Sequence, residues 1–157
     1  LGDVYKRQFL YSLVMDTYSF GYSSSGFTDM PMNHKVFLAQ FDAIKKLASE
    51  GPCVMVGRCA DYALSEYKDC FSVFVHADTD WRINRLSQKH NKTAKEAKDM
   101  INKTDKSRSS YYNYYTNKKW GAASSYNLCV DSSKLGIDGA AKAIIQAIEI
   151  FDSIKNK

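Results

Sequence analysis

Apolar residues along this chain follow two alternating patterns. Short, nearly unbroken apolar runs occur at residues 53–56, 71–77 and 126–131, and such runs are typical of strands covered on both faces of a sheet. Between these runs and after the last one, apolar residues recur three or four positions apart, which predicts helices. Strands that alternate with helices favour an α/β fold whose parallel sheet has helices on both faces.

Capping and turn residues set the expected helix boundaries. The predicted helices begin with these residues: Asn33, Ala60, Asp78 or Thr79, Thr93 and Gly139. Gly51 ends the first of them, and the second is short and extends to Tyr67. Thr93 and Glu96 have the spacing of a capping box, which opens a long helix that continues into the tyrosine-rich segment.

Composition limits the class of protein. With 157 residues, of which 45% are hydrophobic and 25% charged, the chain fits one soluble globular domain. No apolar run approaches the ~20 residues that cross a bilayer, so we expect no membrane partner. The net charge of +5 indicates an anionic partner without identifying it. The four cysteines lack C-x-x-C and zinc spacing, which favours buried free thiols in the cytoplasm.

Residues 1–8 have a different origin in our interpretation. DVYKRQ, residues 3–8, is the translation of GATGTGTATAAGAGACAG, which resembles the transposon-end adapter of sequencing libraries. We therefore assign residues 1–8 to a cloning or assembly scar, outside the fold. Residues 9–157 are then expected to form one domain.

Polar residues follow the three predicted strands. Arg58 comes directly after Gly57 at the end of the first, His76 lies at the end of the second, and Asp131 ends the third. In parallel α/β sheets, ligands bind beyond the carboxyl ends of the strands. Arg58 is the strongest candidate for an anion contact, with a surface salt bridge as its alternative. Residues such as His76 and Asp131 are more often turn or helix-entry residues than ligand contacts.

Two further pairs of charged residues have helical spacing. Arg82 and Arg85 lie on one helix face, where they form either a phosphate-binding pair or a solvated surface. Asp105 and Arg108 share a face in the same way. Residues 103–120 interleave basic residues with tyrosines, which suits stacking on single-stranded nucleic acid or docking of a flap onto its own domain.

One glycine-rich segment partly matches the motif of a phosphate-binding loop. GYSSSGFT, residues 21–28, has Phe27 where the motif requires lysine. It follows no clear apolar strand and precedes no helix. We therefore do not assign it a phosphate-binding role.

Four segments together resemble the cytidylate kinase-like family of P-loop phosphotransferases. They are CVMVGRCADYAL, VFVHADTDWRINRL, KTDKSRSSYYNYYTNKKWG and YNLCVDSSKLGIDGA, in this order. The resemblance implies a three-layer parallel sheet of the nucleoside-monophosphate kinase type. It also implies an acceptor-side loop region at residues 9–35 and a lid at about residues 79–120. The implied reaction transfers the γ-phosphoryl group of ATP, with Mg²⁺, to a pyrimidine nucleoside monophosphate, with nucleotides rather than nucleic acid as partners.

The resemblance also implies roles for particular residues. Substrate-binding residues would be Arg58, Asp61 and Asp105, and catalytic residues would be Arg82, Arg85 and Arg108. Cytidylate kinases have a Gly-Arg-Asp turn, but the aspartate position here is Cys59. The resemblance therefore leaves the acceptor nucleotide open between CMP, UMP and others.

The family begins with a strand, a glycine-rich phosphate loop and a helix, and we identify none of these in this chain. We therefore expect a truncated form whose own phosphoryl transfer is lost or weak. Two alternatives stay open: a nucleotide-binding module without catalysis, and a binder of single-stranded RNA.

Overall fold

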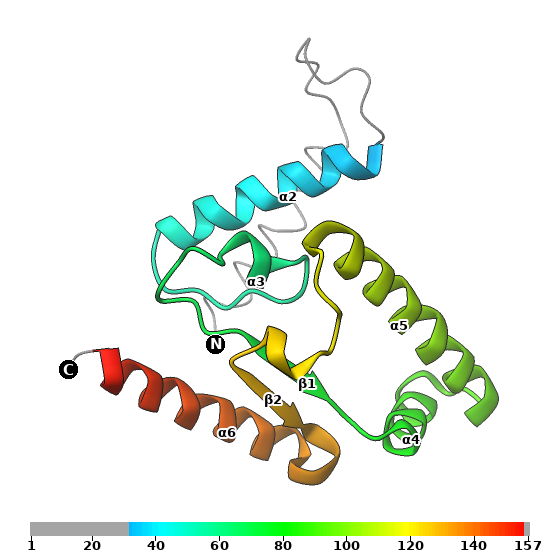
Figure 1. Ribbon diagram of the computed structural model, residues 1–157. Coiled ribbons are helices and arrows are strands. Elements are labelled where there is room, and N and C mark those ends of the chain that lie inside the picture. Colours follow the sequence, from blue (N-terminus) through cyan, green and yellow to red (C-terminus); the bar gives the residue numbers. More distant parts are fainter. Residues whose placement is uncertain (1–31, 156–157) are drawn as a thin grey trace. The chain divides into compact units, whose positions relative to one another are not determined.

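The computed structural model describes residues 32–155, and the chain divides into two compact units at residue 68. Each unit is described by itself below (Figure 1). The first contains two helices, α2 (Met32–Ser49) and α3 (Ala60–Ala63). The elements of the second are β1 (Val73–His76), α4 (Thr79–His90), α5 (Ala94–Thr116), the 3-10 helix η1 (Ala123–Ser125), β2 (Leu128–Asp131) and α6 (Ser132–Lys155). The acceptor-side loop region falls largely outside the described residues, and so do the predicted scar and residues 21–28.

Aromatic side chains hold the first unit together. Phe37 and Ile44 of α2 are buried, as the helical spacing of the apolar residues predicts. Phe41 lies 5.9 Å from the ring of Phe37 and 6.2 Å from the ring of Tyr62, so it joins α2 to α3. The helix begins at Met32, and Asn33 therefore lies inside it rather than at its cap.

The predicted strand at residues 53–56 is wrong. This segment has no strand hydrogen bonds, and the side chains of Val54 and Val56 are 81% and 90% exposed. A short apolar run becomes a strand only where a neighbouring strand pairs with it, and none of the described residues does so here. Apolar composition alone did not distinguish an extended segment from a paired strand.

The helix predicted for residues 60–67 is also shorter than expected. It covers one turn, Ala60–Ala63, and Leu64 leaves helical geometry at φ −103°. Arg58 and Cys59 precede it with φ of 56° each, the left-handed conformation that non-glycine residues seldom adopt. The chain thus makes a tight bend directly before α3.

The second unit is built around a small parallel sheet. β1 and β2 are its two strands among the described residues, in a register that pairs Val73 with Leu128 and His76 with Asp131. Both strands lie inside the predicted runs at 71–77 and 126–131, but each is shorter. The unit has a mixed α/β fold, and the described residues contain no further strand that would extend this sheet.

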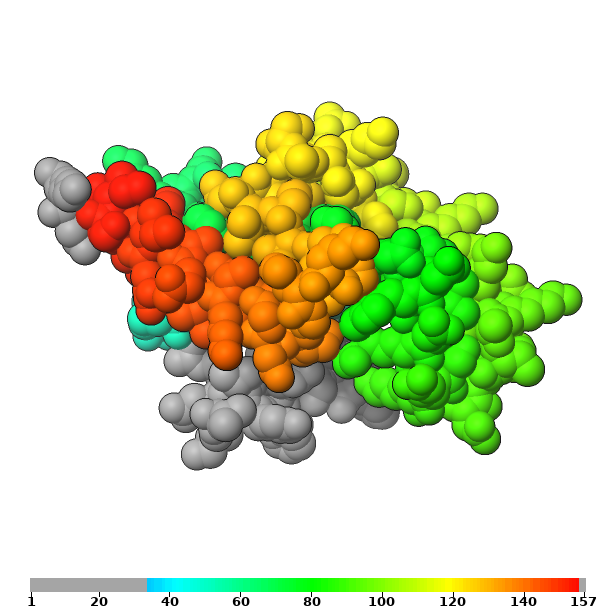
Figure 2. Space-filling view, turned by 90° about the horizontal axis from the view of Figure 1, so that it is seen from below, coloured from blue at the N-terminus to red at the C-terminus, as the bar shows by residue number. Residues whose placement is uncertain are grey.

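Helix α6 runs beside both strands (Figure 1). The ring of Phe151 lies 5.1 Å from that of Phe71, next to the sheet. The helix begins at Ser132, earlier than the predicted Gly139, and kinks at Gly136, where φ is 69° and ψ is 173°. Glycine suits this kink because a side chain would oppose the positive φ. In Figure 2 the first residues of α6 (orange) lie against the start of α4 (green).

Helices α4 and α5 pack together, and side chains cap both as predicted. The Asp78 carboxylate accepts hydrogen bonds from the backbone N–H groups of Asp80 and Trp81 at the start of α4. Thr93 and Glu96 form the complete capping box of α5. Side-chain oxygens thereby satisfy helix donors that have no intrahelical partner.

An aromatic cluster links β1 to the segment that follows α5. Phe74 lies 5.4 Å from the ring of Trp120, edge to face, and 5.0 Å from that of Tyr126. A Cβ on Gly121 would lie 3.2 Å from the Phe74 ring, so glycine permits this close approach. The Asn113 side chain accepts a hydrogen bond from the Trp120 backbone N–H at 2.7 Å, which ties the cluster to α5.

The cysteines differ in burial from the prediction of buried free thiols. None of the four cysteines forms a disulfide, and the prediction of buried thiols is confirmed for Cys59 alone, since Cys53 and Cys70 are half-buried and Cys129 is exposed. Cys129 is exposed because neighbouring side chains of β2 point to opposite faces of the strand, and the next residue, Val130, occupies the buried face.

Within residues 32–155, no helix is both long enough and apolar enough to cross a membrane.

Candidate functional site

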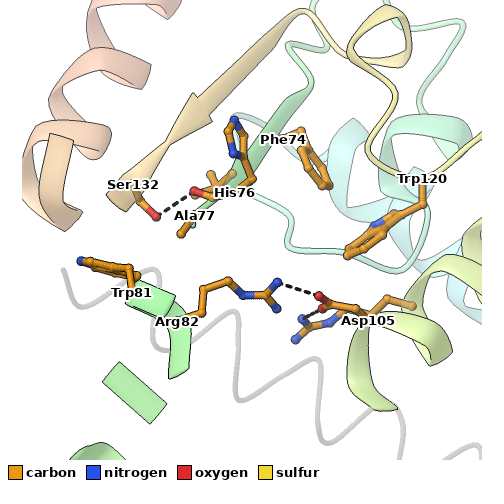
Figure 3. A pocket seen from close by; sticks show the side chains of 10 residues that line it. Phe74, His76, Ala77, Trp81, Arg82, Asp105, Trp120 and Ser132 are labelled. Carbon is orange, nitrogen blue, oxygen red and sulfur yellow. Dashed lines mark hydrogen bonds and ion pairs between the residues drawn. The ribbon is translucent and has the colours of Figure 1, made fainter. Parts of the chain in front are cut away.

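An open cleft of about 410 Å³ lies at the carboxyl end of β1 in the second unit. The lining residues come from β1, α4, α5, the Trp120 segment and the start of α6 (Figure 3). The side chains that matter chemically are Trp81, Arg82, Asp105, Arg108 and Trp120. The cleft is therefore aromatic and charged together, and every contributing element belongs to one compact unit.

Two arginines share one carboxylate in this cleft. Arg82 extends from α4 toward α5, and its Nη1 lies 2.7 Å from Oδ2 of Asp105 (Figure 3). Nη1 of Arg108, one helical turn after Asp105, lies 3.4 Å from the other carboxylate oxygen. We call Arg82, Asp105 and Arg108 the arginine–aspartate triad. The capping of α4 by Asp78 and of α5 by Thr93 fixes the helices that carry it.

The triad keeps an excess of positive charge. Two guanidinium groups face one carboxylate, and each guanidinium has five N–H donors, more than the carboxylate can accept. The Arg82 and Asp105 side chains are 30% and 23% exposed, whereas that of Arg108 is 59% exposed. Ion pairs this exposed contribute little to folding stability. Their significance is that they orient donors toward an open cleft.

Aromatic rings surround the triad. Trp120 and Phe74 lie on one side of it and Trp81 on another (Figure 3). The His76 ring stacks near that of Phe74 at 6.3 Å. Planar rings next to guanidinium groups suit a ligand that joins a flat heterocycle to an anionic group.

Arg85 does not line the cleft, although it shares a helix face with Arg82 in the sequence pattern. Its guanidinium carbon lies 5.5 Å from the centre of the Trp81 ring, a cation–π contact. Arg85 therefore contacts a residue of the cleft wall without lining the cleft itself. The two arginines of α4 thus have different surroundings.

Arg58 and Asp61 belong to the first unit, whereas the triad belongs to the second. Asp61 lies in the first turn of α3, directly after the left-handed bend at Arg58 and Cys59. Burial, then the nearby Asp61 carboxylate, raise the pKa of the Cys59 thiol to about 11, against a smaller opposing effect of Arg58. The thiol is therefore protonated and unreactive at neutral pH, and it does not reproduce the charge of an aspartate.

His76 and Asp131 end neighbouring strands and are paired in the sheet register. Asp131 accepts hydrogen bonds from the hydroxyl and the backbone N–H of Ser133. The Ser133 hydroxyl, the Ser133 N–H and the nearby charges of His76 and Lys134 hold its pKa below the usual range, against a partial desolvation. A turn role at the entry to α6 therefore accounts for Asp131.

The tyrosine-rich part of α5 distributes its side chains over different environments. Tyr112 is buried, Tyr111 and Tyr115 are half-buried with ring centroids 4.8 Å apart, and Tyr114 is 77% exposed. One helix face thus does not bury all four tyrosines. Most of this segment therefore serves packing around α5.

Sequence reasoning did not identify four residues at this site: Trp81 and Trp120 in the cleft wall, and Ser132 and Ser133 at the strand ends. The tryptophans carried a signal, since both tryptophans of the chain lie in segments rich in arginine or lysine. The two serines carried none, because a serine after a strand is common in turns.

The described residues do not form a site for Mg²⁺. No group of three or more His, Cys, Asp or Glu side chains in residues 32–155 could hold a metal ion. The carboxylate that lines the cleft, Asp105, is already paired with two arginines. The cleft thus favours an anion over a cation, and we derive no step through a metal.

Fold and site together define a mixed α/β protein with a cleft lined by arginines and aromatic rings at the end of a parallel sheet. The model of the cytidylate kinase-like family matches residues 3–134. This chain belongs to that family, which suggests a nucleotide kinase-like function. The match begins inside residues 1–8, and their assignment to an adapter stays a prediction.

One solved structure similar to this chain is a crystal structure of an uncharacterized protein from Eubacterium ventriosum ATCC 27560. It is 33% identical, with a TM-score of 0.72, and the alignment covers 78% of this chain and 69% of that one. No curated protein matches the chain. The chain thus shares its fold over most of its length with that uncharacterized protein.

Proposed function

We propose that this chain is part of a phosphotransferase that moves the γ-phosphoryl group of ATP to a nucleoside monophosphate, with a pyrimidine acceptor. The observation that carries the proposal is the arginine–aspartate triad in the aromatic cleft. Membership of the cytidylate kinase-like family supports it. The proposal includes a three-layer P-loop architecture, to which β1 and β2 would contribute two strands.

The chemistry of phosphoryl transfer fits an arginine-lined cleft. Charge on the transferred group spreads over its equatorial oxygens, so catalysis depends on positioning and on charge neutralisation rather than on a nucleophilic side chain. Guanidinium groups bind phosphate through paired N–H donors, and they stay charged at any physiological pH. In this proposal Arg82 and Arg108 contact phosphate oxygens and are the catalytic residues of the described part.

The remaining candidate residues take supporting roles in the proposal. Arg85 contacts Trp81 in the unliganded form and joins the phosphate contacts on closure of the lid. Arg58 and Asp61 hold the acceptor nucleotide, and Asp105 orients both arginines as well as the acceptor. Since Cys59 is a neutral thiol, the acceptor is not restricted to CMP. ATP with Mg²⁺ is the proposed phosphoryl donor, bound outside the described residues.

Calorimetric titration with CMP, UMP and inorganic phosphate tests this proposal. Arg82→Gln and Arg108→Gln should each weaken nucleotide binding roughly tenfold or more, because each removes a charged hydrogen-bond donor to phosphate. Lys98→Gln is the matched control, since Lys98 is exposed on α5 and does not line the cleft. Equal affinities of the arginine variants and the control would show that the cleft is not the nucleotide site.

A coupled assay with ATP tests whether this chain itself transfers a phosphoryl group. Transfer that depends on Arg82 supports catalysis by this chain and contradicts the expected loss of transfer. Binding without transfer agrees with that loss, and it fits a truncated kinase and a nucleotide-binding module alike.

A further inference from the structure

Four elements meet at one hydrogen-bonded junction in the second unit: the ends of β1 and β2 and the starts of α4 and α6. Asp131 closes β2, and Ser133 lies in the first turn of α6. The Asp131 carboxylate oxygen Oδ1 accepts from the Ser133 backbone N–H at 2.9 Å and from the Ser133 hydroxyl at 2.5 Å. The end of the strand is thereby fixed to the beginning of the helix.

The Ser133 hydroxyl has a second partner. Its single hydrogen is donated to Asp131, so its oxygen is available as an acceptor. The backbone N–H of Asp78 donates to that oxygen at 3.1 Å. Asp78 is the N-cap of α4. One hydroxyl therefore connects the end of β2 to the start of a helix that lies 55 residues earlier in the chain.

From Asp78 the connection continues to the triad. Asp78 accepts from the N–H groups of Asp80 and Trp81 with its side chain, and its carbonyl accepts from the Arg82 N–H at 3.0 Å. These bonds fix the first turn of α4, which carries Arg82. The Arg82 guanidinium then reaches Asp105 at 2.7 Å.

We propose that Ser133, oriented by Asp131, is a positioning residue for Arg82 and so sets the geometry of the anion-binding cleft. This inference rests on the proposed function, in which Arg82 binds nucleotide phosphate. In this proposal neither Ser133 nor Asp131 contacts the ligand. They hold the helix from which the contacting guanidinium extends.

The two serines at the start of α6, Ser132 and Ser133, bond to different elements, and only the bond of Ser133 leads to α4. Ser132 donates its hydroxyl hydrogen to the carbonyl oxygen of His76 at 3.0 Å, so it joins α6 to β1 and not to α4 (Figure 3). Ser133 alone of the two bonds to the cap of α4. Small displacements matter here, because misplacing a charged contact by about 1 Å reduces function by up to about 100-fold.

The test compares Ser133→Ala with Ser133→Thr and Ser153→Ala. Threonine keeps the hydroxyl, and Ser153 bonds only to the carbonyl of Ile150 within α6, so its loss is the matched control. The first readout needs no ligand: the NMR resonance of the Arg82 Nε–H group should shift in Ser133→Ala and stay in place in the other two. The second is CMP affinity, which should fall roughly tenfold in Ser133→Ala only.

A double substitution identifies the route of the effect. If Ser133 acts through Arg82, then Ser133→Ala should cost little further CMP affinity in an Arg82→Gln background. A full additional loss in that background, or an unmoved Arg82 resonance in Ser133→Ala, overturns the positioning role. Absence of CMP binding in the unmodified chain, with the resonance shift present, overturns the proposed function and leaves the positioning of Arg82 supported.

Discussion

At the residue scale, Asp105 has two opposing effects on the cleft. Its carboxylate holds Arg82 at 2.7 Å and Arg108 at 3.4 Å, so it orients both guanidinium groups. The same carboxylate neutralises part of their charge and repels an entering anion. A phosphate that binds here competes with Asp105 for the arginine donors.

This competition predicts a gain of function. Asp105→Asn removes the negative charge but keeps a side-chain oxygen that accepts hydrogen bonds, so it should bind inorganic phosphate several-fold more tightly. The gain should shrink as salt is added, because screening weakens the electrostatic contribution. Isothermal calorimetry at two salt concentrations measures the gain in phosphate affinity and its dependence on salt.

The control for that prediction is Asp99→Asn, which makes the same charge change on the same helix outside the cleft. Inorganic phosphate is the ligand because it has no base or sugar for Asp105 to contact. Weaker or unchanged phosphate binding by Asp105→Asn would contradict the competition.

Sequence reasoning found the charged residues of the cleft and the caps of their helices, but it missed the contacts between distant segments. Helical spacing joined Asp105 to Arg108 and Arg82 to Arg85, but no periodicity shows that Arg82 reaches Asp105 across two helices. Ser133 and Trp120 depend on the sheet register and on the chain after α5. Such contacts between distant segments are set by tertiary packing, and short sequence patterns do not contain them.

At the element scale, the capping box of α5 supports half of the triad. The Thr93 hydroxyl accepts a hydrogen bond from the Glu96 N–H at 3.3 Å, and the Glu96 carboxylate accepts from the Thr93 N–H at 2.8 Å. Asp105 and Arg108 both lie on the helix that this box begins. Their orientation depends on the helix more than on any single contact.

Thr93→Ala should lower the free energy of unfolding by about 0.5–2 kcal/mol, the usual cost of losing an N-cap. Urea denaturation at neutral pH measures this loss. Ser107→Ala is the matched control, because Ser107 is exposed within the same helix and caps nothing.

The effect of Thr93→Ala also has a defined pH dependence. The Thr93 hydroxyl, followed by the Thr93 backbone N–H, lowers the pKa of Glu96. A carboxyl group whose pKa is lowered by folding stabilises the fold above its unfolded pKa, and this contribution is lost as pH falls through its folded pKa. The loss in free energy of unfolding caused by Thr93→Ala should therefore become smaller in acid. A loss that stays constant from neutral pH to pH 3 would contradict this pH dependence.

The two helix starts that side chains cap, those of α4 and α5, were better predicted than the strands, for a physical reason. Caps such as Asp78 and Thr93 act within a few residues, so the sequence contains their whole signal. A strand needs a partner from elsewhere in the chain, and the segment 53–56 shows the consequence, since its apolar residues lack one among the described residues. The kink at Gly136 likewise joins two helical segments that the sequence pattern did not connect.

At the scale of the whole molecule, four motifs in order led to the family, and the match to residues 3–134 confirms it. The three-layer sheet was an implication of the family and stays a prediction, and the described residues contain a sheet of two parallel strands. The net charge of +5 suits a nucleotide ligand, and the triad concentrates positive charge in one cleft. The central claim is that this cleft binds the phosphate of a nucleotide.

Intrinsic fluorescence tests that claim most directly, because both tryptophans of the chain, Trp81 and Trp120, line the cleft. Titration with CMP should change the emission and saturate, and cytidine at equal concentrations should have little effect because it lacks the phosphate. Trp81→Phe and Trp120→Phe then show which ring responds. Equal responses to CMP and cytidine, or no response to either, would contradict phosphate binding in this cleft.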